Sequence, residues 1–230
     1  MIYRVLQLLI ILLLIAVSSS IAQTTFTSTQ SGDWDDGGTW GNTSPGVQGT
    51  DWPATTDNAV IASGHTVTLT AAETINDLTI NSGGVLNDDN AGDITVDGNL
   101  VLNGTKTGVK DILFTGGSGQ TIDGTGIHSS SKNIVINGDA SILSTASLTI
   151  INNIALGNGV TATNNGTITI NGSITGAMGT WVNAANSSLT VATNLLTGGG
   201  TLTASASGNT VVFNKNGAQN IKTPTGTPGE

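Results

Sequence analysis

The sequence predicts an all-β protein whose strands stack as a right-handed parallel β-helix. Short apolar triplets with a polar middle residue, such as Leu78-Thr79-Ile80 and Ile168-Thr169-Ile170, recur along the chain. Their period of two is typical of strands with one buried face. Asn-Gly, Asp-Gly and Ser-Gly-Gly separate the triplets, and glycine and asparagine favour turns. Related segments also recur at long intervals, which indicates a repeat architecture.

Internal repetition favours this solenoid over the alternative fold, a β-sandwich. The segment Ile112–Ile122 recurs as Val211–Ile221, with phenylalanine, glutamine and isoleucine matched at an offset of 99 residues. A second match, at an offset of 76 residues, links Ile75–Ile80 to Ile151–Leu156. We interpret these matches as superrepeats of several coils. We expect about seven or eight coils of about 20–25 residues around one aliphatic core, with asparagine and threonine forming hydrogen-bonded ladders between coils.

Residues 1–22 have the pattern of a cleaved signal peptide. The positive charge of Arg4 precedes the apolar run Leu8–Val17, and the small-residue triplet Ser20-Ile21-Ala22 provides a cleavage site. The apolar run is shorter than the roughly 20 residues that a membrane-spanning helix needs. We therefore expect a protein that is secreted or displayed on the bacterial cell surface, with no membrane span after cleavage.

The composition bounds both stability and partners. The chain has no cysteine, 9% charged residues and a formal net charge of −9. Nucleic acid is not an expected partner, because phosphate contacts need clustered lysine and arginine. Secretion permits disulfides, so their absence indicates a fold stabilised by a long core or by repetition and not by covalent cross-links.

Residues 23–72 form a tryptophan-rich N-terminal cap in this interpretation. Trp34, Trp40 and Trp52 lie in this segment, whereas Trp181 is isolated and is expected to pack in the core or a turn. The three indoles can plug the open end of a solenoid, which would otherwise expose its core. Alternatively, their flat apolar faces form a platform for sugar rings, which makes them the candidate glycan-binding residues.

The same segment carries a family resemblance. Trp34 and Trp40 are separated by five residues and precede the run Asp57-Asn58-Ala59-Val60-Ile61-Ala62-Ser63-Gly64-His65-Thr66-Val67-Thr68-Leu69. This opening is similar to that of large secreted bacterial proteins and resembles the start of the G-eight domain, a glycine-rich all-β module of extracellular proteins. The insertion between Thr43 and Trp52 is longer than usual. The resemblance implies a cell-surface or extracellular role and supplies no enzyme mechanism.

Residues 73–230 are expected to form the β-helix coils. Their rhythm resembles the β-helical stalks of bacterial surface adhesins, which are often exported by the type IX route. The repeat around Phe213 stops at Glu230, whereas its partner around Phe114 is followed by further coils. A solenoid needs a cap at its end, so we expect a chain truncated at its C-terminus.

Charged side chains offer few candidates for catalysis or metal binding. Asp88 and Asp89 are weak calcium candidates, because oxygen-rich loops suit calcium; no other cofactor is expected. His65 and His128 are not placed beside a nucleophile elbow, so no catalytic residue is assigned. Paired carboxylates could hydrolyse glycosides, but the acidic clusters lie in glycine- and asparagine-rich loops.

The sequence therefore predicts a non-catalytic, adhesin-like stalk of the cell surface. The alternative is a carbohydrate-binding or carbohydrate-active β-helix module, such as a polysaccharide lyase or glycoside hydrolase. Extracellular polysaccharide or cell-surface components are the expected partners in either case.

Overall fold

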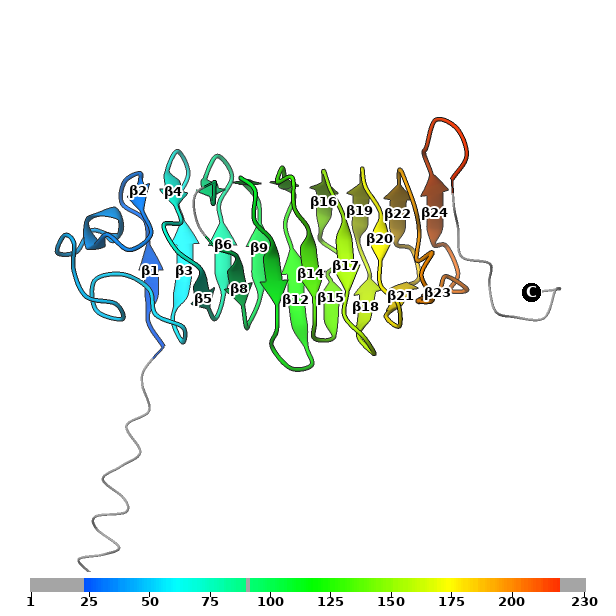
Figure 1. The fold of residues 1–230 in the computed structure, drawn as a ribbon, viewed down its shortest axis with the longest axis horizontal. Helices are drawn as coiled ribbons and strands as arrows, with labels where there is room; N and C mark the ends of the chain where they lie inside the picture. Colours follow the sequence, from blue (N-terminus) through cyan, green and yellow to red (C-terminus); the bar gives the residue numbers. More distant parts are fainter. Residues whose placement is uncertain (1–22, 90–91, 220–230) are drawn as a thin grey trace, which may run out of the picture.

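The computed structural model describes residues 23–89 and 92–219, which form a parallel β-helix of about seven turns (Figure 1). The predicted fold class is confirmed: the strands pair in parallel in three stacked sheets, and one short 3-10 helix, η1 (Gly37–Trp40), is present among these residues. Each complete turn adds one strand to sheet 1, then one to sheet 2 and one to sheet 3. The expected signal peptide, residues 1–22, lies outside the described residues.

Nine strands form sheet 1: β1 (Thr25–Thr27), β3 (Asn58–Ile61), β6 (Leu78–Ile80), β9 (Leu100–Leu102), β12 (Gln120–Asp123), β15 (Ala140–Ile142), β18 (Thr161–Asn164), β21 (Thr180–Asn183) and β23 (Thr201–Thr203). Nine form sheet 2: β2 (Gly32–Asp33), β4 (Thr66–Thr68), β7 (Val85–Asn87), β10 (Thr105–Thr107), β13 (Ile127–His128), β16 (Ser147–Ile150), β19 (Thr167–Ile170), β22 (Ser188–Val191) and β24 (Thr210–Phe213). Six form sheet 3: β5 (Glu73–Ile75), β8 (Ile94–Val96), β11 (Ile112–Phe114), β14 (Ile134–Ile136), β17 (Ile154–Leu156) and β20 (Ile174–Thr175).

The register of the strands gives the length of a coil. In sheet 1, Leu78 pairs with Leu100 and Leu100 pairs with Ile122, an interval of 22 residues each time. The interval shrinks to 19 residues between Ala162 and Trp181. Coil lengths therefore lie within the expected range or just below it, because three-residue strands joined by tight turns need few residues.

Rows of stacked side chains fill the interior of the coil. In sheet 3, isoleucines at five successive levels pair in register and are buried: Ile94, Ile112, Ile134, Ile154 and Ile174. Burying a side chain of this size contributes about 1.5–3 kcal/mol. The alternating apolar triplets of the sequence thus place their outer residues in the core and their middle residue on the surface.

The sequence matches at long offsets do not mark structurally equivalent coils. Phe114 lies on β11 in sheet 3, whereas Phe213 lies on β24 in sheet 2. The interpretation as superrepeats is therefore wrong. The match is a local one: Gln120 Nε2 donates to the carbonyl oxygen of Val96 at 2.8 Å, and Gln219 Nε2 donates to that of Val191 at 3.0 Å. In both units the acceptor residue is the one that pairs with the phenylalanine in the preceding coil.

Polar ladders tie the turns of successive coils together, as expected from the asparagine content. One ladder follows the turns before sheet 3, where each side-chain oxygen accepts a backbone N–H of the next coil. Asp93 Oδ1 accepts from Asp111 at 3.0 Å, Asp111 Oδ1 from Asn133 at 2.6 Å, and Asn153 Oδ1 from Ser173 at 2.7 Å. Each bond satisfies a backbone donor that the turn leaves outside the sheets.

Candidate functional site

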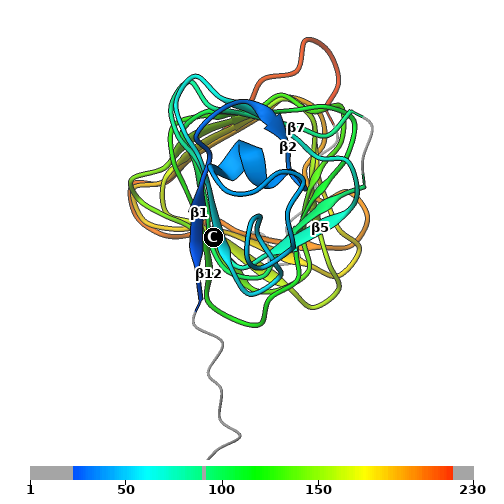
Figure 2. The same ribbon diagram turned by 90° about the vertical axis from the view of Figure 1, so that its left-hand side faces the viewer.

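Two places in the described structure gather side chains that could serve a function: the tryptophan-rich N-terminal end and a polar cluster inside the coil. At the N-terminal end, η1 lies across the open end of the solenoid (Figure 2). The stack already begins here, because β1 pairs with β3 and β2 pairs with β4. The segment 23–72 therefore contains the first strands of sheets 1 and 2 as well as the helix that covers them.

Local hydrogen bonds fix the position of η1. Asp36 caps the helix, and its Oδ1 accepts from the backbone N–H of Gly38 at 2.8 Å. Gly41 ends the helix with a φ of 79°, a conformation that favours glycine. A Cβ atom on Gly37 would lie 1.9 Å from the carbonyl oxygen of Thr43, so only glycine fits there. The helix thus carries Trp40 to a fixed place over the core.

Trp34 and Trp40 close the end of the core. Trp34 is 0% exposed and Trp40 is 4% exposed. Their rings meet edge to face with centroids 5.2 Å apart, and Phe26 packs against Trp40 in the same way at 6.3 Å. Trp40 Nε1 also donates to the carbonyl oxygen of Trp34 at 2.8 Å. Neither indole presents a face to solvent on which a sugar ring could stack.

Trp52 differs from the other two candidates because part of its surface is exposed while the rest packs against the core. Two carboxylates hold its loop. Asp51 accepts from the backbone N–H of Val47 at 2.9 Å, and Asp57 accepts from Thr24 at 3.0 Å and from Ala54 at 2.9 Å. The structure thus brings Trp34 and Trp40 together inside and leaves Trp52 as the candidate whose side chain reaches the surface. Trp181 is fully buried in the core.

A serine–histidine contact is present near this end. Ser28 Oγ lies 2.9 Å from His65 Nδ1, which is the first contact that a nucleophilic dyad requires. Ser28 is only 2% exposed, however, and its oxygen also accepts the backbone N–H of Ala62 at 2.9 Å. The contact ties the first coil to the second, and a substrate would have no access to the hydroxyl.

Glu73 occupies the place in its row that the isoleucines of sheet 3 fill in later coils, since it pairs with Ile94. Burial, with a smaller contribution from the charge of Asp35, raises the pKa of Glu73 to about 7. This carboxyl therefore changes its charge near neutral pH.

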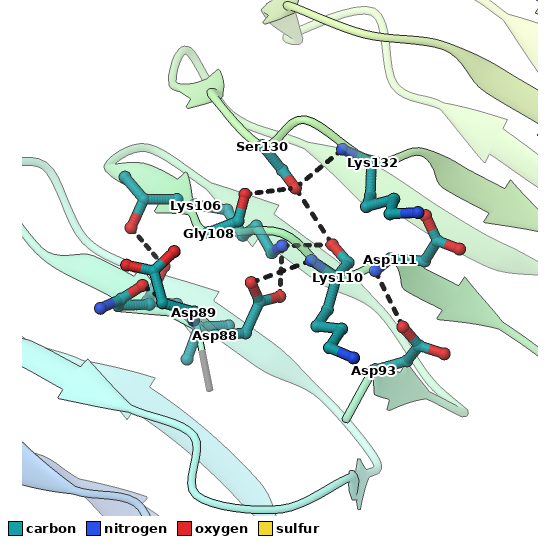
Figure 3. Close-up of polar contacts among 12 residues, drawn as sticks. Asp88, Asp89, Asp93, Lys106, Gly108, Lys110, Asp111, Ser130 and Lys132 are labelled. Carbon is teal, nitrogen blue, oxygen red and sulfur yellow. Dashed lines mark hydrogen bonds and ion pairs between the residues drawn. The ribbon is translucent and has the colours of Figure 1, made fainter. Parts of the chain in front are cut away.

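The second place is a polar cluster in the inward row of sheet 2. Along this row Leu86 pairs with Lys106, Lys106 with His128, and His128 with Ile150. Lys106 and His128 are both 0% exposed. Lys106 Nζ forms an ion pair with Asp88, which is also 0% exposed and belongs to the preceding coil (Figure 3).

Hydrogen bonds surround this ion pair. Lys106 Nζ donates to the carbonyl oxygen of Lys110 at 2.5 Å, and Asp88 Oδ1 accepts from the backbone N–H of Lys110 at 3.1 Å. Ser130 Oγ donates to the carbonyl oxygens of Gly108 at 3.0 Å and of Lys110 at 3.1 Å (Figure 3). A Cβ atom on Gly108 would lie 2.0 Å from Asp88 Oδ1, so a glycine is needed for the backbone to approach the carboxyl.

His128 completes the cluster as a neutral group. Burial, and to a smaller degree the neighbouring Lys106, lowers the pKa of His128 to about 3. Neither ring nitrogen has a hydrogen-bond partner in another residue of the described chain.

This cluster was not predicted from the sequence, although the sequence contains a signal for it. Lys106 stands between two threonines where the preceding coil has Leu86, and His128 follows Lys106 by 22 residues, which is one coil. The weak calcium candidates do not converge on one position: Asp88 points inward to Lys106, and Asp89 is exposed. Among residues 23–89 and 92–219, no group of three or more acidic or histidine side chains is arranged to hold a metal ion.

Comparisons with known proteins identify no relative of this chain. No protein-family model, no curated protein and no solved structure matches the chain. Within the described residues, no helix has the length and apolar character needed to cross a membrane. The class of protein that the structure defines is the parallel β-solenoid.

Proposed function

We propose that this protein is a secreted or cell-surface β-solenoid that acts as a non-catalytic, adhesin-like stalk. The observation that carries the proposal is the hydrophobic core that continues along the stack of coils. Buried side chains stack from Phe26 in the first strand to Leu195 beyond the last strand of sheet 3. A stack in which each coil bonds to the coils on both sides resists bending and proteolysis along its whole length. Such a rod suits the presentation of a binding surface at a distance from the cell.

The outward side chains and the N-terminal segment support the same role. Several strands have a small polar middle residue, such as Thr79, Thr95 and Thr169, and the net charge of −9 keeps rods apart in solution. Residues 1–22 act as the signal peptide in this proposal, and the G-eight-like opening agrees with an extracellular location.

Removal of one coil tests the stalk proposal on cells that produce the protein. Ile112 and Ile134 are equivalent in register, so deletion of residues 112–133 shortens the rod and leaves both ends unchanged. We expect a membrane-impermeant, amine-reactive reagent to label the protein on intact cells and gene disruption to reduce attachment. We expect the shortened protein to be displayed and to restore attachment in part. Attachment that is unchanged by disruption, or a protein that stays inside the cell, would contradict the proposal.

The second candidate function is glycan binding or turnover at the tryptophan cluster, and the partly exposed Trp52 favours it. Titration of the purified protein with polysaccharides, with and without calcium, should then change Trp emission in a saturable way. The change should disappear in Trp52→Phe, while release of reducing or unsaturated sugar would identify a hydrolase or lyase. Under the stalk proposal, the emission of the buried indoles stays blue-shifted and does not respond to ligand.

A further inference from the structure

The buried Lys106–Asp88 pair joins two successive coils inside the solenoid. Asp88 follows β7 and Lys106 lies on β10, the strand that pairs with β7 in the next coil. Both side chains are 0% exposed, and the Lys106 ammonium touches the Asp88 carboxyl (Figure 3). The reactive atoms of an amine and a carboxylic acid are therefore held together where solvent has no access.

Burying an ion pair inside the coil costs free energy. Moving two charges out of water costs several kcal/mol per ion, and their attraction often fails to offset that cost. Burial accordingly raises the pKa of the Asp88 carboxyl and lowers the pKa of the Lys106 ammonium. Transfer of one proton from Nζ to Oδ2 converts the pair into a neutral amine and a neutral acid without any outside reagent.

We propose that Lys106 and Asp88 form an intramolecular isopeptide bond, which the folded chain makes by itself. The Nζ lone pair attacks Cγ of the protonated Asp88 carboxyl, so that the C–N bond forms and the negative charge moves to Oδ1. The C–Oδ2 bond then breaks, and Oδ2 leaves as water with its own proton and one proton from the nitrogen. No oxidant or second substrate takes part, and one water molecule is the only other product.

The backbone around the pair is arranged for this reaction. Asp88 Oδ1 accepts from the backbone N–H of Lys110 at 3.1 Å. A backbone donor at the oxygen that becomes negative stabilises a tetrahedral intermediate, as in an oxyanion hole.

The product fits the site better than the ion pair does. The amide oxygen would keep the Lys110 N–H donor, and the remaining amide N–H would keep the Lys110 carbonyl oxygen at which Nζ now points. Both polar atoms of the bond are thus satisfied, and both buried charges disappear. A chain without cysteine would gain a covalent link between coils.

Intact-mass spectrometry of the denatured, purified protein tests the proposal. The protein should be lighter than its calculated mass by one water molecule. The variant Lys106→Met should have its full calculated mass, which separates this bond from water lost elsewhere in the chain. The controls Lys132→Met and Asp89→Asn replace exposed residues of the neighbouring turns, and both should keep the loss of water.

Trypsin gives a second readout that does not depend on any variant. Lys106 is the first lysine after the expected signal peptide, and trypsin cleaves after it only if its amine is free. We expect cleavage after Lys110 and none after Lys106, so that one peptide of residues 23–110 carries both partners and is lighter than its calculated mass by one water molecule. A full-mass protein that is cleaved after Lys106 would overturn the proposal.

Discussion

His128 occupies an inward position that most other coils fill with leucine, isoleucine or valine. Its pKa in the folded state is about 3 because of burial, whereas an unfolded histidine titrates near about 6.5. Between these values the unfolded chain binds a proton that the folded chain does not. The free energy of unfolding therefore falls as the pH falls from about 6.5 towards 3, by at most about 1.4 kcal/mol per pH unit.

We predict that His128→Leu removes this acid sensitivity. Leucine suits the apolar row and leaves no buried nitrogen without a partner, so the variant should equal or exceed the wild type in stability at pH 7 and exceed it clearly at pH 4.5. Urea unfolding curves at both pH values measure the difference. Parallel loss of stability in both proteins on acidification would show that His128 is not the group responsible.

The pKa shift of Glu73 makes stability depend on pH in the opposite direction to that of His128. Its pKa rises from 4.5 to about 7 on folding, so the folded state holds its proton more tightly. The contribution to stability is present below pH 4.5 and is lost as the pH rises through 7.

We predict that Glu73→Gln raises the melting temperature at pH 8 and leaves it nearly unchanged at pH 4.5. Asp35→Asn is the matched control, since it removes only the smaller cause of the pKa shift and should give a smaller increase. A variant that melts like the wild type at pH 8 would contradict the assigned cause.

At the scale of strands and turns, buried side chains that form hydrogen bonds hold successive coils and their turns together. Asn164 is fully buried at the end of β18 and makes three bonds. Its Nδ2 donates to Asn183 Oδ1 at 2.8 Å and to the carbonyl oxygen of Ser188 at 3.1 Å, while its Oδ1 accepts from Gly166 at 3.1 Å. One amide thus joins two coils and the turn between sheets 1 and 2.

We predict that Asn164→Ala lowers the free energy of unfolding by about 2–3 kcal/mol, because three polar groups lose their partner in the interior. The exposed Asn158 provides a control in the neighbouring turn, and Asn158→Ala should change stability by less than about 0.5 kcal/mol. Chemical denaturation of both variants makes the comparison. Equal effects would mean that the ladder adds little to stability.

The sequence was sufficient to predict the strands, the polar ladders and the solenoid, because period-two triplets and glycine turns are local signals. It was not sufficient to assign strands to sheets. All three sheets use the same triplets and turns, so Phe114 and Phe213 match in sequence although they belong to different sheets. The cluster of Lys106 and His128 was missed for a related reason: charged residues are expected on the surface, and only the coil interval shows that they point inward.

At the scale of the whole molecule, the two ends of the described stack differ. Trp34, Trp40 and η1 cover the first coil. On β24, Val212 and Phe213 are 42% and 38% exposed. Cooperative stability in a stack depends on its end coils, because each coil has contacts only with its neighbours.

We predict that Trp40→Ala destabilises the entire protein, by about 3–5 kcal/mol, since it opens a cavity over the end of the core. Trp52→Ala removes a partly exposed ring and should cost clearly less. Thermal melts followed by far-UV circular dichroism compare the two variants. A larger loss for Trp52→Ala would contradict the assignment of Trp40 to the cap.

The one-coil interval between paired strands also bears on how the chain is made. Apart from β5, which begins sheet 3, every strand from β3 onward pairs with one that was synthesised earlier, and from β6 onward that strand lies about 20 residues back. A nascent chain can therefore begin folding while its C-terminal part is still inside a ribosome or a narrow export channel. The tryptophan-rich N-terminal end emerges first, and each later coil can then pair with the coil before it. Assembly then has a fixed direction, from the closed end outward.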